Sequence, residues 1–494
     1  MSASSSPSPP VPVEGVGPSG SGAVVWVLAL GGITVSLMQT LIIPIVPELP
    51  KLLNSSPSDA TWAITATLLA GAVANPVVGR LGDMYGKRRM LLLSLVLLIA
   101  GSVIGALSDS LVPMIVGRTF QGVSMAVIPL GISIMRDELP PERLGSATAL
   151  MSASLGVGGA LGLPTAAFIA EKADWHVLFW TAAVLGAVVT ALVVALVPES
   201  AVRSGGRFDV VGGVGMSIGL VCLLLAISKG ADWGWGSGTT TGLFATAVVV
   251  LLVWGWWELR TVRPLVDLRT SARRQVLLTN LASVMFGFAM FAMSLAVPQL
   301  LQLPTLTGYG LGQSVLAAGL ALGPSGLVMM ATAPLSARIS ATAGPRITLM
   351  LGALIVAAGY GLGVVMMAAV WQVVVVCCVI SAGVGFAYGA MPALIMGAVP
   401  LSETAAANSL NSLMRSIGTS ASSAVAGVVL AHMTTSFGSF TAPSHNGFRV
   451  IMGIGSASSL AALFLAAFLP GRRKPVTAGM PATATARAGA SSSG

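Results

Sequence analysis

Residues 79–89 read G-R-L-G-D-M-Y-G-K-R-R, and this stretch places five charges and three glycines between two long apolar runs. Lys and Arg accumulate in the short loops of membrane proteins that stay in the cytoplasm. We therefore interpret 79–89 as a cytoplasmic loop, and its two flanking segments as membrane helices.

The composition indicates a polytopic membrane protein in a lipid bilayer. Hydrophobic residues make up 55% of 494 positions and charged residues 8%, and the mean hydropathy is +0.90, far above that of soluble domains. A net charge of +9 in a soluble protein would suggest nucleic acid. Here the basic residues concentrate in short loops, so no nucleic-acid partner is predicted. The three cysteines lie in apolar runs, which argues against a disulfide framework or a metal site.

Fourteen apolar stretches are long enough to cross about 30 Å of hydrocarbon. They span residues 23–46, 60–80, 89–108, 111–133, 143–170, 176–197, 210–230, 238–259, 275–301, 312–334, 345–368, 371–397, 404–432 and 448–469. Residues 1–22 are mostly Ser, Pro and Gly, and we expect them, like 471–494, to form disordered cytoplasmic tails.

The basic residues orient these helices. With 79–89 inside, 19 of the 25 Lys and Arg residues fall on one side. An even helix count puts both termini on that side, which the positive-inside rule makes the cytoplasm.

A repeat divides the chain into two halves. Pro76, Arg80, Leu81, Gly86 and Arg88 recur as Pro334, Arg338, Ile339, Gly344 and Arg346, each 258 residues later. This spacing suits six helices plus two inserted ones. We predict an all-α protein with a six-helix bundle at 23–200, an inserted helix pair with its linkers at 201–272, and a second six-helix bundle at 273–470. Such repeats enclose a cavity near the bilayer midplane.

The chain resembles the major facilitator superfamily, and within it the drug:proton antiporter branch with fourteen helices. The resemblance rests on the spacing of the 79–89 motif, on Arg118, Gln121 and Gly122, on D-W-H-V-L-F at 174–179, and on F-D-V-V-G at 208–212. It implies a monomeric transporter of a bacterial cell membrane that exports amphipathic drugs or antibiotics in exchange for protons, without a cofactor. A facilitator or importer of one small metabolite on the same fold is the alternative.

An enzyme is not predicted, because His176, His432 and His445 are scattered and form neither a catalytic nor a metal-ligand pattern.

The resemblance assigns a conformational latch to the motif, formed by Gly79, Arg80, Asp83, Gly86 and Arg88. Asp83 is expected to meet the start of the helix near Thr404, where the helix dipole favours a carboxylate. The alternative is an ordinary solvated loop.

Arg118 and Gln121 are the residues to which the resemblance gives a role in proton coupling. Arg118 lies inside the apolar run 111–133, where a charge normally faces a cavity or a partner. Bonding to carbonyls of a neighbouring helix is the structural alternative.

The acid that the branch often carries in its first helix is absent here. Met38 occupies its place, and all 16 acidic residues lie in tails, loops or helix ends. A carboxylate near the outer face, such as Glu48, Asp59 or Asp109, is one candidate to exchange a proton beside Arg118.

A polar stripe in 404–432 is predicted to line the substrate cavity. Asn408, Asn411 and Arg415 share a helix face, and Arg415 lies near the midplane. Gln39, Met125 and Asn280 are expected to add polar and adaptable surface. The alternative for Arg415 is a structural bond to the other half.

Overall fold

The computed structural model describes residues 18–42, 45, 48–200, 202–205, 207–437 and 440–470. Within these residues, fourteen helices are long and apolar enough to cross a membrane, as predicted. The expected disorder of 1–17 and 471–494 falls outside the described residues. At 18–22 the expectation was wrong: α1 already begins at Pro18, since Pro is well suited to the first turn of a helix.

The first half contains six spans in chain order. They are α1 (Pro18–Leu41), α4 (Trp62–Tyr85), α5 (Lys87–Ala106), a fourth span made of α6 (Leu111–Val123), the 3₁₀ turn η2 (Ser124–Ala126) and α7 (Val127–Glu138), then α8 (Pro141–Lys172) and α9 (His176–Leu196). Short helices α2 (Leu49–Leu52) and α3 (Pro57–Ala60) join α1 to α4.

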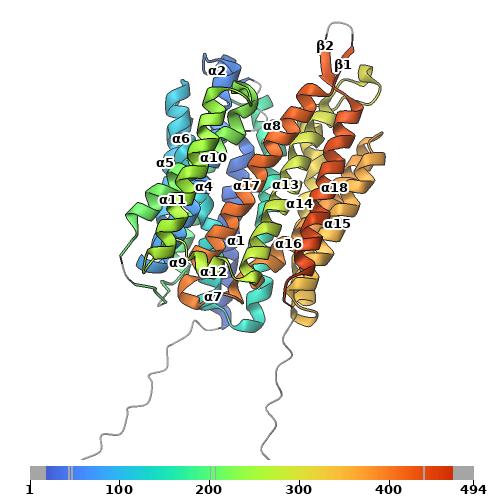
Figure 1. Ribbon diagram of the computed structural model, residues 1–494. Coiled ribbons are helices and arrows are strands. Elements are labelled where there is room, and N and C mark those ends of the chain that lie inside the picture. Colours follow the sequence, from blue (N-terminus) through green and yellow to red (C-terminus); the bar gives the residue numbers. More distant parts are fainter. Residues whose placement is uncertain are drawn as a thin grey trace, which may run out of the picture.

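Two inserted helices and a linker follow. They are α10 (Val210–Trp233), α11 (Gly238–Arg260) and the short α12 (Leu268–Ser271). Helix α10 packs on α4 of the first half and on α17 of the second, whereas α11 packs mainly on α10. Figure 1 shows this pair on the outside of the bundle. Most of α11 is exposed, as expected of an apolar helix that faces lipid.

The second half repeats the arrangement. Its elements are α13 (Arg274–Gln302), η3 (Thr305–Thr307), α14 (Val315–Thr342), α15 (Pro345–Val365), α16 (Val370–Met396), η4 (Leu401–Glu403), α17 (Thr404–His432), the strands β1 (Thr434–Phe437) and β2 (Phe440–Pro443), and α18 (His445–Ala467). The strands form an antiparallel hairpin that the sequence did not predict.

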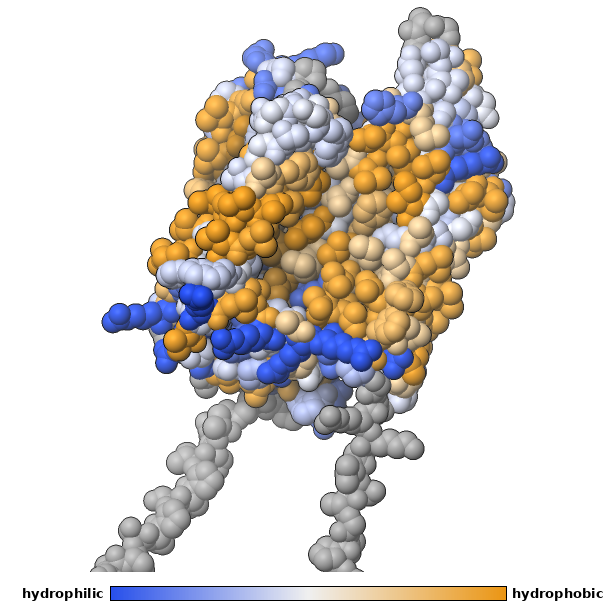
Figure 2. All heavy atoms as spheres, in the orientation of Figure 1, coloured by the Kyte–Doolittle hydropathy of each residue, from blue (hydrophilic) through white to orange (hydrophobic). Residues whose placement is uncertain are grey.

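The halves meet through two related helix pairs, because α4 packs on α17 and α8 packs on α14. We call the end of the bundle that carries Arg80, Arg88, Arg136, Arg263 and Arg346 the basic face. Hydrophilic residues cross this end in Figure 2, and the opposite end shows a notch between the halves.

The predicted loop at 79–89 is helical over most of its length. Helix α4 continues to Tyr85 and α5 begins at Lys87, so only Gly86 separates them. Its φ of 121° lies in a region that only glycine enters readily. Gly344, the repeat of Gly86, has a φ of 96° between α14 and α15. The break in each helix therefore depends on glycine, because polar residues alone do not end a helix.

Candidate transport pathway

Asp83 joins the two halves at the basic face. Its carboxylate is fully buried and accepts hydrogen bonds from the backbone nitrogens of Ala405 at 3.2 Å and Ala406 at 2.8 Å, in the first turn of α17. A helix N-terminus offers unpaired N–H groups and a partial positive charge, so it attracts a carboxylate. The contact implied by the family resemblance is therefore present in the fold.

Gly79 lets α4 and α17 approach closely one turn earlier. A Cβ atom at this position would lie 2.2 Å from Oγ of Ser409 and 2.9 Å from the carbonyl oxygen of Ala405. A larger side chain would therefore separate the two helices at the Asp83 contact.

A buried lysine holds the Asp83 side of this contact. Nζ of Lys87 lies 3.8 Å from Asp83 and 2.6 Å from Asp137. Oγ of Ser200 also donates to Asp137, at 2.5 Å. Two carboxylates thus share one ammonium group, which offsets part of the cost of burying the charges.

Arg136, at the end of α7, makes a second connection that sequence reasoning missed. Its guanidinium donates to Oγ1 of Thr404 at 2.6 Å and to the carbonyl oxygens of Met396 at 2.8 Å and Val399 at 3.1 Å. The predicted span ended at residue 133, which left Arg136 in a loop. The sequence signal that could have found this connection is an arginine at the end of a long helix on the basic face.

The other motif residues act within the first half or beside it. Arg88 donates to the carbonyl oxygen of Val194 at 2.6 Å, and its backbone nitrogen lies 3.3 Å from Oε1 of Glu199. Arg80 lines a separate cavity, described below. Of the five predicted latch residues, Gly79 and Asp83 are therefore the two that contact α17 directly.

The carboxylate of this contact occurs in one copy of the repeat only. Asp83 corresponds by the 258-residue offset to Ala341, which has no carboxylate. Helix α14 packs on α8 as α4 packs on α17, so the two helix pairs are equivalent, but a carboxylate at this position is present only in the first pair.

A small central cavity lies between the halves. Its walls from the first half are Ile128, Pro129, Ile132, Ser152 and Leu155, and from the second half Tyr388, Met391, Pro392, Asn408, Asn411, Ser412 and Arg415. Its volume is about 20 Å³, enough for about one water molecule. Drug-sized ligands need sites of about 300–1,000 Å³, so a substrate fits only after the halves separate.

Arg415 enters this cavity from α17. It donates to Oγ of Ser412 at 3.1 Å, and its guanidinium carbon lies 4.9 Å from the ring centre of Tyr388. Both contacts are within the second half. Among the described residues, Arg415 forms no ion pair within 4 Å and no hydrogen bond to the first half. The structural alternative for Arg415 required such a bond to the first half.

The polar side chains around Arg415 form hydrogen bonds with one another. The amide nitrogen of Asn411 donates to Oδ1 of Asn280 at 2.9 Å and to Oγ of Ser283 at 2.7 Å. Asn75 donates across the halves to Oγ of Ser412 at 3.2 Å. The stripe predicted on α17 thus lines the cavity, and Asn280 does not line it but accepts a hydrogen bond from Asn411, which does.

Gln39 and Met125 do not line the cavity in this conformation. Met125 lies in η2 and packs against Gly71 of α4. The 3₁₀ turn changes the helical register between Arg118 and Pro129. The helix face that carries Arg118 therefore does not continue in regular register to Pro129.

Arg118 is buried between α1, α4 and α6. Its Nε donates to the carbonyl oxygen of Ala63 at 2.9 Å, and one terminal nitrogen donates to Oε1 of Gln121 at 2.7 Å and lies 3.5 Å from both the carbonyl oxygen and the sulfur of Met38. Gln121 in turn donates to Oγ of Ser102 at 2.8 Å. No carboxylate among the described residues pairs with Arg118 within 4 Å. The fold instead contains the bonds to carbonyls of neighbouring helices that were the structural alternative for this residue.

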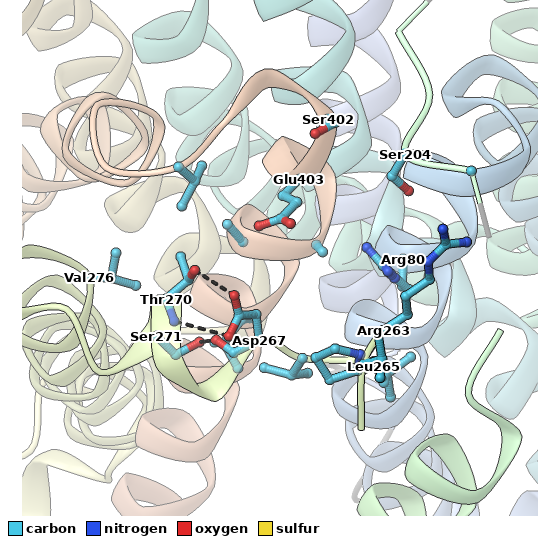
Figure 3. Close-up of a pocket in the computed structure, with 18 residues that line it drawn as sticks. Arg80, Ser204, Arg263, Leu265, Asp267, Thr270, Ser271, Val276, Ser402 and Glu403 are labelled. Carbon is cyan, nitrogen blue, oxygen red and sulfur yellow. Dashed lines mark hydrogen bonds between the residues drawn. The ribbon is translucent and has the colours of Figure 1, made fainter. Parts of the chain in front are cut away.

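A second cavity, of about 280 Å³, lies at the basic face between α4, α17 and the linker 262–271. Figure 3 shows Arg80 and Arg263 on one side of it, and Asp267 and Glu403 on the other. Burial opposes ionisation of Asp267, but hydrogen bonds from Thr270 and Arg269 hold the pKa of its carboxyl below the usual value. The α17 residues here, such as Ala406 and Leu410, lie on a different helix face from Arg415, so this cavity is separate from the central one.

Comparisons with known proteins agree with this architecture. The chain is 24% identical over 383 residues to multidrug resistance protein 3 of Bacillus subtilis, covering 76% of this chain and 73% of that one. It is 28% identical over 333 residues to the tetracenomycin C resistance and export protein of Streptomyces glaucescens, covering 67% and 61%.

Two solved structures share the fold. The human organic anion transporter MFSD10 matches with a TM-score of 0.66 at 16% identity, covering 90% of this chain and 99% of that one. The proton:xylose symporter XylE matches with a TM-score of 0.61 at 14% identity, covering 92% and 96%. Residues 28–423 match the family model of the Major Facilitator Superfamily. With its repeated halves and fourteen membrane helices, this chain belongs to the major facilitator superfamily of transporters.

Proposed function

We propose that the protein exports amphipathic organic compounds, including drugs or antibiotics, across a bacterial plasma membrane in exchange for protons. The observation that carries the proposal is the central cavity between two halves that are joined at the basic face by Asp83 and Arg136. A further hydrogen bond between the halves, from Asn75 to Ser412, lies nearer the centre. The names of the relatives as multidrug resistance and antibiotic export proteins support the direction of transport.

In this proposal the basic face and both termini lie in the cytoplasm. Breaking the contacts of Asp83 and Arg136 opens the cavity to the cytoplasm for loading. Re-forming them closes that side while the halves separate at the opposite face, so the substrate leaves outward.

A facilitator or importer of one metabolite is the second candidate, and a specific observation favours it. The first helix carries Met38 where the branch often has an acid, and Arg118 bonds to carbonyl, amide and thioether groups instead of a carboxylate. Proton coupling would then need a carboxylate elsewhere, or would be absent.

Proteoliposomes with an acidic lumen separate the two candidates. We expect purified protein to accumulate amphipathic dye in the lumen, and added dye to speed the loss of the pH gradient. A panel with positive, neutral and negative dyes avoids missing a charge-selective protein. If the gradient neither drives accumulation nor responds to any dye, proton antiport is excluded and the facilitator candidate takes its place.

The topology makes a separate prediction. In a variant without Cys222, Cys377 and Cys378, single cysteines replace Ser55, between α2 and α3, and Glu142, in the first turn of α8 at the basic face. An impermeant thiol reagent added to intact bacteria should label position 55, and label position 142 only after the cells are opened. The reverse pattern would invert the assigned orientation and with it the direction of export.

A further inference from the structure

The charge of the central cavity is unbalanced. Arg415 is the one charged residue among those that line it, and none of the lining residues is Asp or Glu. An arginine near the bilayer midplane is costly and normally pairs with an anion or with several acceptors. Its hydrogen bond within the described part of the chain goes to one hydroxyl, that of Ser412, although a guanidinium has five N–H donors.

A second buried donor belongs to Tyr388, whose ring contacts Arg415. The hydroxyl of Tyr388 belongs to a side chain that is 1% exposed, and it has no hydrogen-bond partner among the residues that the structure describes. The ring of Tyr388 lies 4.9 Å from the guanidinium carbon of Arg415, and both residues line the central cavity. Buried hydroxyl groups usually have a partner, so this pair of donors is suited to an acceptor that comes from outside the protein.

The opposite wall has a different character. Four of its five lining residues from the first half are apolar, namely Ile128, Pro129, Ile132 and Leu155, and Ser152 adds one hydroxyl. A ligand that fills the site after the halves separate would therefore meet a cation and a hydroxyl on one side, and an apolar surface on the other.

We propose that the substrate is an amphipathic organic anion, whose carboxylate, sulfonate or phenolate oxygen binds Arg415 and the Tyr388 hydroxyl while its apolar body contacts the first half. This inference rests on the proposed transport function and specifies its substrate class. Arg415 repels a cationic compound of similar shape, because charge interactions strengthen where water is excluded.

Two fluorescent dyes with similar three-ring bodies test the charge preference. Fluorescein is an anion at neutral pH and rhodamine 123 is a cation. In energised inverted membrane vesicles, we expect the parent protein to accumulate fluorescein about tenfold faster than rhodamine 123, with dye quantified at fixed pH after lysis. Accumulation of rhodamine 123 at an equal or greater rate would overturn the inference while leaving the export function in place.

Variants of the two donors identify the residues responsible. Arg415→Gln should lower fluorescein accumulation about tenfold or more without lowering that of rhodamine 123, and Tyr388→Phe should lower fluorescein accumulation several-fold. Arg449→Gln, which removes an exposed arginine at the start of α18, is the matched control and should behave like the parent. Equal loss of both dyes in Arg415→Gln would make Arg415 structural.

Arg415→Lys guards against misfolding, since it keeps the charge and should retain the preference for fluorescein. Binding of fluorescein to purified protein, followed by fluorescence anisotropy, separates the two proposals. Anisotropy that rises with the parent and not with Arg415→Gln supports the anion site even if transport fails. Failure of fluorescein to bind to the parent overturns the site.

Discussion

Asp83→Asn should leave the protein folded and inserted but lower its transport rate by about tenfold or more. The Asp83 carboxyl group accepts two backbone hydrogen bonds at the start of α17, at 2.8 and 3.2 Å, and hydrogen bonds to a charged carboxylate contribute about 1.5–3 kcal/mol each. An amide is neutral and offers one acceptor oxygen to the two N–H donors. A loss of about 2 kcal/mol would lower the population closed at the basic face about thirtyfold relative to the open one.

The change in population is measurable apart from transport. A cysteine in place of Ile132, which lines the central cavity, should react faster with a thiol reagent applied from the basic face when Asp83 is replaced by Asn. Glu142→Gln is the matched control, because Glu142 lies in the first turn of the related helix α8 and is exposed. Unchanged labelling together with unchanged dye efflux at normal expression would rule out the latch.

Arg118→Ala should cause the largest loss of stability of any change in the first half that we consider. The substitution removes donors to the carbonyl oxygen of Ala63, to Gln121 and to Met38 and leaves a cavity in a packed region. The carbonyl oxygen of Ala63 keeps a donor in Oγ1 of Thr67, but Oε1 of Gln121 loses its donor. A buried acceptor left without a donor costs about 1–3 kcal/mol, and the cavity adds to this cost. We expect the unfolding midpoint of the purified protein to fall by about 5 °C or more, with loss of transport.

Arg118→Lys should lower the unfolding midpoint and the transport rate less than Arg118→Ala does, but both values should stay clearly below those of the parent protein. One ammonium cannot reach groups on α1, α4 and α6 in the way that a planar guanidinium does. Arg449→Lys provides the exposed control. The opposite result is informative: a normal unfolding midpoint in Arg118→Ala, with loss of the response to a pH gradient, would assign Arg118 to proton coupling instead of to packing.

Helix number and the relation between the halves followed from the sequence alone. The fourteen apolar runs are long enough to define each span without tertiary information, because the bilayer sets a minimum length. The repeat of Gly86 as Gly344 also marked both breaks correctly, since a positive φ depends on the local residue. The sequence likewise placed Asp83 at the start of α17, through a resemblance whose motif is local.

Helix ends, by contrast, were placed less well. Helix α14 extends to Thr342, eight residues past the predicted end, because the polar residues after Pro334 are compatible with a helix in the headgroup region. The same error left Arg136 in a loop, and so hid its bonds to Thr404 and Met396.

By itself, then, the sequence determined which segments cross the membrane and that the two six-helix halves are copies of one another. These features depend on hydrophobic length, charge and glycine at fixed positions along the chain. The tertiary structure alone decided that Arg118 bonds to carbonyls of α1 and α4, that Arg415 and Tyr388 lie together as donors without an acid, and that Met125 turns away from the cavity. Each of these depends on which faces of distant helices meet. That depends on the side-chain packing of all fourteen helices together, and hydropathy along one helix carries no record of it.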